Sequence, residues 1–133
     1  MLSEFHAGLR REYSRAVRYR QNLALLLVDL PPTPVVLGRT RDAVRLCDSA
    51  SPAPGGGVAV ILPETALAGA LLVATRLAGA LGPSPATGGP QAIGVAAYPS
   101  PSVADGDALI RAAETAMERA RSQGGGILTP VSR

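Results

Sequence analysis

Two copies of the pattern Arg-x-x-Asp lie close together in the first half of the chain. One runs from Arg39 to Asp42 and the other from Arg45 to Asp48. A guanidinium group can clamp a phosphate or the edge of a guanine, and a carboxylate can accept hydrogen bonds from guanine nitrogens. The pattern could therefore bind a guanine nucleotide. The alternative is a surface ion pair of little energetic value, since all 13 basic residues are arginine and the pattern can arise by chance.

The other side chains that could do chemistry stand alone in the sequence. Asp29 ends the apolar run Leu23–Val28, where a carboxylate could hold a metal, but a single carboxylate is more simply a turn or cap residue. Cys47 is the only cysteine, so the chain can form no intramolecular disulfide. As a nucleophile, Cys47 would need a histidine, and His6 is the only one. We therefore predict no catalytic residue, no metal site and no cofactor.

The composition predicts a folded domain with a core of small apolar side chains. Hydrophobic residues make up 47% of the chain, whereas aromatic residues make up 3% and tryptophan is absent. A core of Leu, Val, Ile and Ala depends on close interdigitation rather than on a few large side chains. A length of 133 residues is ordinary for one domain, so we expect a single domain over residues 1–133.

Basic residues are concentrated near the N-terminus, although the formal net charge is only +3. A nucleic-acid-binding surface is expected to combine such charge with stacking aromatic rings or a recognition helix, and no such motif surrounds Tyr13 and Tyr19. We interpret the arginines as a solvated helix face and expect no nucleic-acid partner. They are Arg10, Arg11, Arg15, Arg18 and Arg20.

The sequence indicates a cytoplasmic protein with no membrane span. Its longest apolar run, around residues 23–28, is far too short to cross a bilayer. Glu4, His6 and Arg10 interrupt the apolar residues at the N-terminus, which is unlike a signal peptide. A lone cysteine also fits a reducing compartment.

Apolar periodicity predicts the element order helix, strand, hairpin, helix, strand, helix, followed by a short edge strand. This order is typical of an α/β sandwich with a mixed sheet. The expected helices cover residues 2–20 and 66–81 and a last segment that ends at about residue 122. The expected strands cover residues 23–28, 43–47, 57–62, 92–98 and 127–128.

Single residues are predicted to set the limits of these elements. Pro31, Pro32 and Pro34 exclude a helix immediately after the first strand. Thr65 is placed to cap the middle helix, and Gly94 marks a position where a side chain would crowd a neighbour. The last helix can be capped by Ser102, Asp105 or Asp107.

Several strings in this order of elements resemble the GGDEF domain, the fold of diguanylate cyclases. Arg15–Tyr19 and Leu23–Leu30 resemble its leading helix and first strand, and Val60–Thr65 resembles the segment after its signature loop. Ile93–Pro99 and Asp107–Arg121 resemble its closing strand and helix. The resemblance spans nearly the whole chain. It implies a nucleotide-cyclase-like α/β sandwich with a mixed, mainly antiparallel sheet.

The chain departs from the family at the signature itself, where it has Pro54–Val58 with three glycines. The resemblance places Gly57 at the position of a metal-binding carboxylate and Gly56 at the neighbouring acidic position. Asp29 matches the first metal-binding aspartate of the family, but Pro31 stands where a second acidic residue is usual. Phosphoryl chemistry on a nucleoside triphosphate relies on divalent metal held by carboxylates. We therefore predict a catalytically inactive domain with a vestigial Asp29.

The family also has a long helical stretch after the first strand, which carries the residues that read guanine. Here a brief proline-rich link leads from Asp29 to Arg39, so the resemblance implies a domain shortened by loss of these helices and of the base pocket. We expect the loss to bare one face of the sheet. Arg121 replaces the phosphate-contacting lysine of the last helix, which keeps the charge but not the geometry.

These features predict a degenerate GGDEF-like domain that acts as a regulatory or protein-interaction module in bacterial signalling, with a protein partner or as a homodimer. The first helix is expected to begin almost at Met1, so no attached sensor domain is expected. The alternative is a receptor for cyclic di-GMP, because GGDEF domains often carry an inhibitory Arg-x-x-Asp site before the signature hairpin. Arg45–Asp48 has the family's spacing, whereas Arg39–Asp42 better matches the local pattern. A residual diguanylate cyclase is the remaining alternative.

Overall fold

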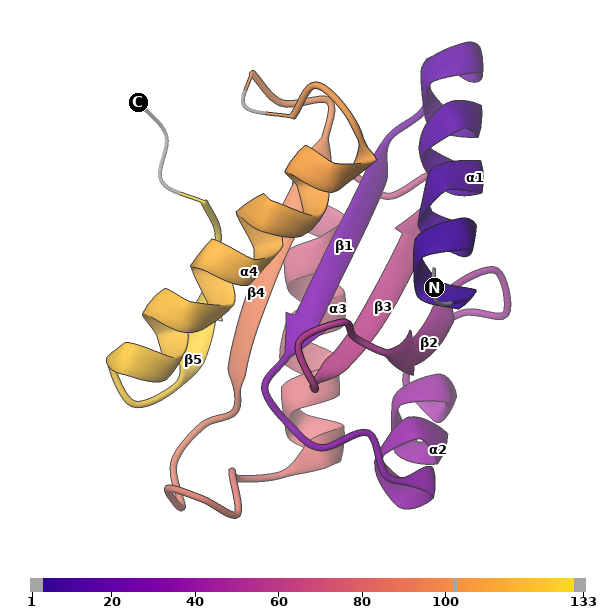
Figure 1. Ribbon diagram of the computed structural model, residues 1–133. Helices are drawn as coiled ribbons and strands as arrows, with labels where there is room; N and C mark the ends of the chain where they lie inside the picture. Colours follow the sequence, from indigo (N-terminus) through magenta and orange to yellow (C-terminus); the bar gives the residue numbers. More distant parts are fainter. Residues whose placement is uncertain (1–3, 102, 131–133) are drawn as a thin grey trace.

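The computed structural model describes residues 4–101 and 103–130. Its five strands form one sheet, and four helices pack on the two faces of that sheet (Figure 1). The expected helix start at Leu2 and the proposed cap Ser102 lie outside the described residues. In chain order the elements are α1 (Glu4–Tyr19), β1 (Leu23–Val28), α2 (Pro34–Asp42), β2 (Ser49–Pro52), β3 (Val58–Pro63), α3 (Leu67–Leu81), β4 (Ala92–Tyr98), α4 (Gly106–Ser122) and β5 (Gly126–Leu128).

The strands lie in the order β2-β3-β1-β4-β5 across the sheet. β1 pairs antiparallel with both β3 and β4, so that Leu25 lies opposite Ile61 on one side and Ala96 on the other. β2 pairs antiparallel with β3, and β5 pairs parallel with β4. The predicted α/β sandwich with a mixed, mainly antiparallel sheet is confirmed.

β1 is buried on both faces, because helices cover the sheet on each side (Figure 1). Leu26 and its alternate neighbours in β1 belong to a core cluster formed with α3, and α2 packs against this cluster. Leu25 and its alternate neighbours belong to a second cluster formed with α1 and α4. The expectation that one face of the sheet would be bare is therefore wrong. No described helix is long and apolar enough to cross a membrane.

The connection after β1 contains a helix, contrary to the prediction from its prolines. Thr33 caps α2, because its side-chain oxygen accepts a hydrogen bond from the Val36 amide at 3.2 Å. Pro34 is the first residue of the helix, where a missing N–H removes no internal hydrogen bond and the fixed φ suits the helix. A helix is therefore present where the resemblance implied the loss of helices.

The predicted hairpin is confirmed, but its first strand begins later than expected. Residues 43–48 form a turn, and β2 begins only at Ser49. The turn forms because the Arg45 amide N–H donates to Asp48 Oδ2 at 2.9 Å, which satisfies a backbone group that a strand would have paired. Pro52 is tolerated in β2, because β2 is an edge strand.

Of the other predictions for single residues, those for Asp105 and Gly94 are confirmed and that for Thr65 is wrong. Asp105 caps α4, since Oδ1 accepts a hydrogen bond from the Ala108 amide at 2.7 Å. Gly94 lies against α4, where an added Cβ would overlap the Ala113 carbonyl oxygen. Thr65 does not cap α3, because the N-cap position is taken by Ala66, which forms no side-chain cap.

Candidate functional site

Asp29, directly after β1, is held by two contacts. Its amide N–H donates to the Ala92 carbonyl at 2.9 Å. Arg121 in α4 donates from Nε to Oδ2 at 2.9 Å and from Nη2 to Oδ1 at 3.3 Å. This bidentate pair raises the pKa of the Arg121 guanidinium, through the hydrogen bond first and the Coulombic attraction second. The carboxylate that resembles a metal ligand is thus paired with an arginine of its own chain.

Gly57 closes the turn between β2 and β3, next to the end of β1. Its carbonyl oxygen accepts a hydrogen bond from the Ala53 amide at 2.7 Å. A Cβ at this position would overlap the carbonyl oxygen of Val28 and would lie 3.8 Å from the Cα of Asp29. Any side chain at position 57 would therefore force the turn away from β1.

The residues at this site do not fit a metal held as in the family. A divalent cation takes several oxygen ligands. Asp29 offers a carboxylate that is already paired, and Gly56 and Gly57 offer no side-chain oxygen. Within residues 4–101 and 103–130, no group of three or more His, Cys, Asp or Glu side chains could hold a metal ion.

Arg45 and Asp48 form an internal contact that we call the Arg45 brace, together with Pro63 and Thr65. Arg45 donates from Nε to Asp48 Oδ2 at 3.2 Å and from Nη2 to Asp48 Oδ1 at 3.0 Å. The same Nη2 donates to the Pro63 carbonyl at 3.0 Å and to Thr65 Oγ1 at 2.6 Å. The hydrogen bond to Asp48 raises the pKa of Arg45 despite some desolvation. The Asp48 side chain is 0% exposed. Because Arg45 contacts Pro63 and Thr65 as well as Asp48, the brace ties the α2–β2 turn to the β3–α3 turn.

The other predicted copy of the pattern lies on α2. Arg39 and Asp42 are both exposed, and within the described residues neither takes part in an ion pair. The structure therefore brings Arg45 and Asp48 together but leaves Arg39 and Asp42 as separate surface side chains.

Two residues at this site were missed by reasoning from the sequence. Thr65 completes the Arg45 brace and donates its hydroxyl to the Pro63 carbonyl at 2.9 Å, although the sequence assigns it to a helix cap. Arg41 donates from Nη2 to the Ala50 carbonyl at 3.3 Å and so joins α2 to β2. Both contacts join residues from different elements, and no local motif indicates them.

No protein-family model matches the sequence, and no curated protein matches it. Solved structures do resemble it. The GGDEF domain of YfiN, also called TpbB, from Pseudomonas aeruginosa has a TM-score of 0.82 and 24% sequence identity, covering 97% of this chain and 94% of that one. The fold is that of GGDEF domains, as the sequence strings predict.

Two other similar structures contain a bound partner. Diguanylate cyclase SiaD from Pseudomonas aeruginosa, in complex with its activator SiaC, has a TM-score of 0.71 at 19% identity, covering 91% of this chain and 54% of that one. The GGDEF domain of DgcB from Caulobacter crescentus, in complex with c-di-GMP, has a TM-score of 0.66 at 17% identity, covering 94% of this chain and 86% of that one. One protein of this fold thus binds an activator protein, and another binds cyclic di-GMP.

Proposed function

We propose that residues 1–133 form one GGDEF-like domain that makes no cyclic di-GMP and acts in bacterial signalling as a regulatory or protein-interaction module. The bidentate contact of Asp29 with Arg121 carries the proposal, together with the lack of room for a side chain at Gly57. Phosphoryl transfer from a nucleoside triphosphate needs metal to neutralise the charge on the phosphates. One carboxylate that is already paired gives such a metal too few ligands.

Incubation of the purified protein with GTP and magnesium is expected to yield no cyclic di-GMP, measured by chromatography and mass spectrometry. The Arg121→Ala variant, which frees the Asp29 carboxylate, is also expected to yield none, because Gly56 and Gly57 still supply no ligand. An active diguanylate cyclase in the same buffer serves as the positive control. Product from the wild-type protein above the level of a no-enzyme blank would refute the proposed inactivity.

The same domain is proposed to bind another protein. The fold supports this, because helices cover both faces of the sheet and a buried core cluster forms on each face although the metal-ligand set is incomplete. A domain that folds without catalytic residues still has surfaces to which another protein can bind. Because SiaD shares the fold and is found with a protein activator, we propose either a separate protein or a second copy of this chain as the partner.

A receptor for cyclic di-GMP is the second candidate function, supported by the exposed Arg39 and Asp42 and by the ligand bound to the DgcB domain. Calorimetric titration with cyclic di-GMP is expected to give no binding heat for the wild-type protein, because Arg45 and Asp48 hold each other in the Arg45 brace. Binding heat that disappears in both Arg39→Ala and Arg45→Ala would establish the receptor function instead.

A further inference from the structure

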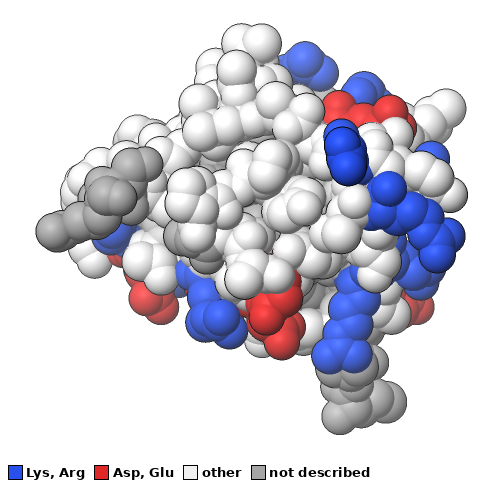
Figure 2. All heavy atoms as spheres, turned by 90° about the horizontal axis from the view of Figure 1, so that it is seen from above, with Lys and Arg blue, Asp and Glu red and all other residues white. Residues whose placement is uncertain are grey.

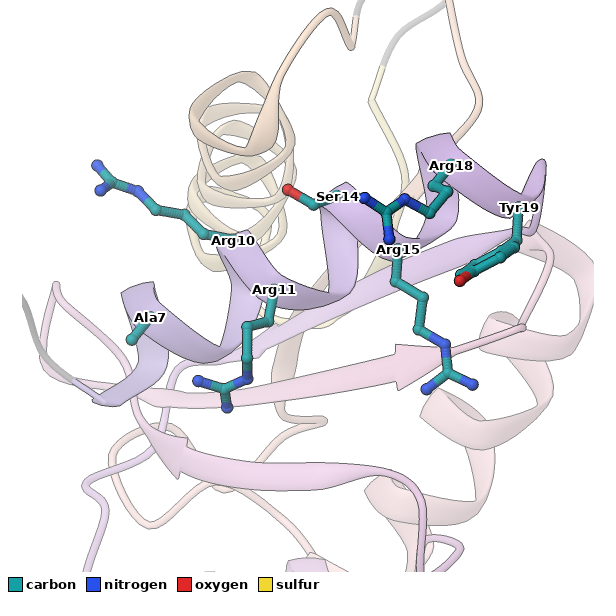
Figure 3. A pocket seen from close by; sticks show the side chains of 7 residues that line it. All are labelled: Ala7, Arg10, Arg11, Ser14, Arg15, Arg18 and Tyr19. Carbon is teal, nitrogen blue, oxygen red and sulfur yellow. The ribbon is translucent and has the colours of Figure 1, made fainter.

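The outer face of α1 carries a shallow hollow of about 690 Å³ that is lined only by residues of this helix. Four arginines line it, together with two small residues: Ser14 lies among the arginines and Ala7 lies beyond Arg10, toward the N-terminal end of the helix (Figure 3). The opposite side of α1 is buried in the core through Phe5, Leu9 and Ala16. The hollow therefore belongs to the free surface of a helix whose orientation is fixed by the core. The arginines are Arg10, Arg11, Arg15 and Arg18.

The hollow lies between two rows of side chains that are spaced four residues apart. Arg11 and Arg15 form one row and point to the same side of the helix, whereas Arg10 points outward on the opposite side (Figure 3). Ser14 and Arg18 continue the row that begins at Arg10. Rows with this spacing form the ridges of a helix, and the groove between two rows accepts a side-chain ridge of a second helix. The shape of the hollow is therefore suited to a helix.

The charge of the hollow is positive, because its charged lining residues are all arginines. Basic side chains gather on this side of the molecule, at the right of Figure 2. Within the described part of the chain, the ion pairs are Arg45–Asp48 and Arg121–Asp29, so no carboxylate there lies within salt-bridge distance of the four arginines of the hollow. Glu4 and Glu12 belong to α1 but do not line the hollow. A partner must therefore bring negative charge.

Three kinds of partner fit this face poorly. A second copy of the chain would place arginines against arginines, and like charges oppose association. A single-stranded nucleic acid would need several stacking surfaces, whereas Tyr19, which is 59% exposed, is the one aromatic ring among the residues that line the hollow, and the Arg18 guanidinium carbon lies 6.0 Å from its ring centroid. Insertion into a membrane would need an apolar helix face, and that face of α1 is in the core.

We propose that the outer face of α1 is a docking surface for an acidic helix of a partner protein. Small side chains of that helix would lie over Ala7 and Ser14. Carboxylates spaced four residues apart would accept paired hydrogen bonds from the flanking arginines, which is the geometry that guanidinium groups favour. The inference rests on the proposed function as an interaction module and names the chemistry of its partner.

The test uses a fluorescent synthetic helix that carries glutamates four residues apart on one face and alanines between them. Its control is a peptide of the same composition with the glutamates distributed around the helix. A DNA duplex and vesicles with anionic lipid are the other probes. In fluorescence anisotropy titrations, we expect the patterned helix to bind about tenfold more tightly than the control peptide, and more tightly than either of the other probes. We also expect affinity to fall as salt is added.

The double variant Arg15→Gln and Arg18→Gln is expected to bind the patterned helix about tenfold more weakly. Glutamine keeps most of the side-chain length, and circular dichroism checks that the variant is folded. Arg111→Gln is the control, because Arg111 is exposed on α4 and does not line the hollow. Equal binding of both peptides, preference for DNA or vesicles, or no binding at all would overturn the inference. If the peptide does not bind and GTP yields no product, the docking surface is refuted and the proposed catalytic inactivity stands. If GTP yields product, the proposed inactivity is refuted and the docking surface is judged by peptide binding.

Discussion

The variant Gly57→Ala is expected to have a free energy of unfolding about 2 kcal/mol lower than that of the wild-type protein. The new Cβ would overlap the Val28 carbonyl oxygen. That oxygen cannot move away easily, because β1 is paired with β3 on one side and with β4 on the other. The turn must shift instead and so weaken the pairing of Val28 with Val58. Urea unfolding followed by circular dichroism measures the change.

The variant Gly55→Ala is a matched control in the same turn. A Cβ at position 55 meets no atom within 4 Å, so we expect a change of no more than about 0.5 kcal/mol. Equal stability of the two variants would show that the overlap with Val28 does not determine the effect. Gly57→Glu, which introduces a carboxylate where the sequence resemblance implies one, is expected to be destabilised as well and to make no cyclic di-GMP.

The variant Gly94→Ala is expected to lose about 3 kcal/mol of stability and to melt about 10 °C below the wild-type protein. A Cβ at position 94 would overlap the Ala113 carbonyl oxygen and approach the Met117 amide. Both atoms are backbone atoms of α4, so no side-chain rotation can relieve the contact. The helix must lift from β4 and expose the residues that it buries there. Thermal unfolding monitored by circular dichroism gives the melting temperature.

Gly79→Ala should change stability in the opposite direction. Gly79 lies on the exposed side of α3, and an added Cβ meets no atom within 4 Å. Alanine in a helix restricts the unfolded chain more than glycine does, which stabilises the folded state by about 0.5–1 kcal/mol. A loss of stability in both variants would contradict the account given for Gly94, because it would show a general sensitivity to glycine substitution.

The sequence predicts those parts of the fold that depend on local periodicity. The apolar spacing of α1, the uniform apolar run of β1 and the cap of α4 at Asp105 all identify elements that the structure contains. α2 could not be found in this way, because the prolines after β1 read as helix breakers, whereas Thr33 caps a helix that begins at Pro34. β2 was misplaced because residues 43–47 are mostly apolar, as in a short strand, whereas the contact of Arg45 with Asp48 turns the chain there.

The sequence predicts the residue types at the candidate site but not their contacts. Gly57 can be recognised as an exchanged metal ligand, yet its lack of room depends on the carbonyl of Val28, which is distant in sequence. The pairing of Asp29 with Arg121 joins residues that are 92 positions apart. The Arg45 brace likewise depends on Pro63 and Thr65, which only the hairpin brings near. Contacts between separate elements become visible only when the strand order is known.

The central place of β1 in the sheet has a consequence for synthesis of the chain on the ribosome. β1 pairs with β4 as well as with β3, so Leu23 lies opposite Tyr98. A chain that emerges from its N-terminus therefore cannot pair both edges of β1 until β4 has left the exit tunnel. Until then, one edge of the six-residue apolar strand offers unpaired N–H and C=O groups to other chains. A strand that is buried throughout in the finished domain is thus open to aggregation in the nascent polypeptide.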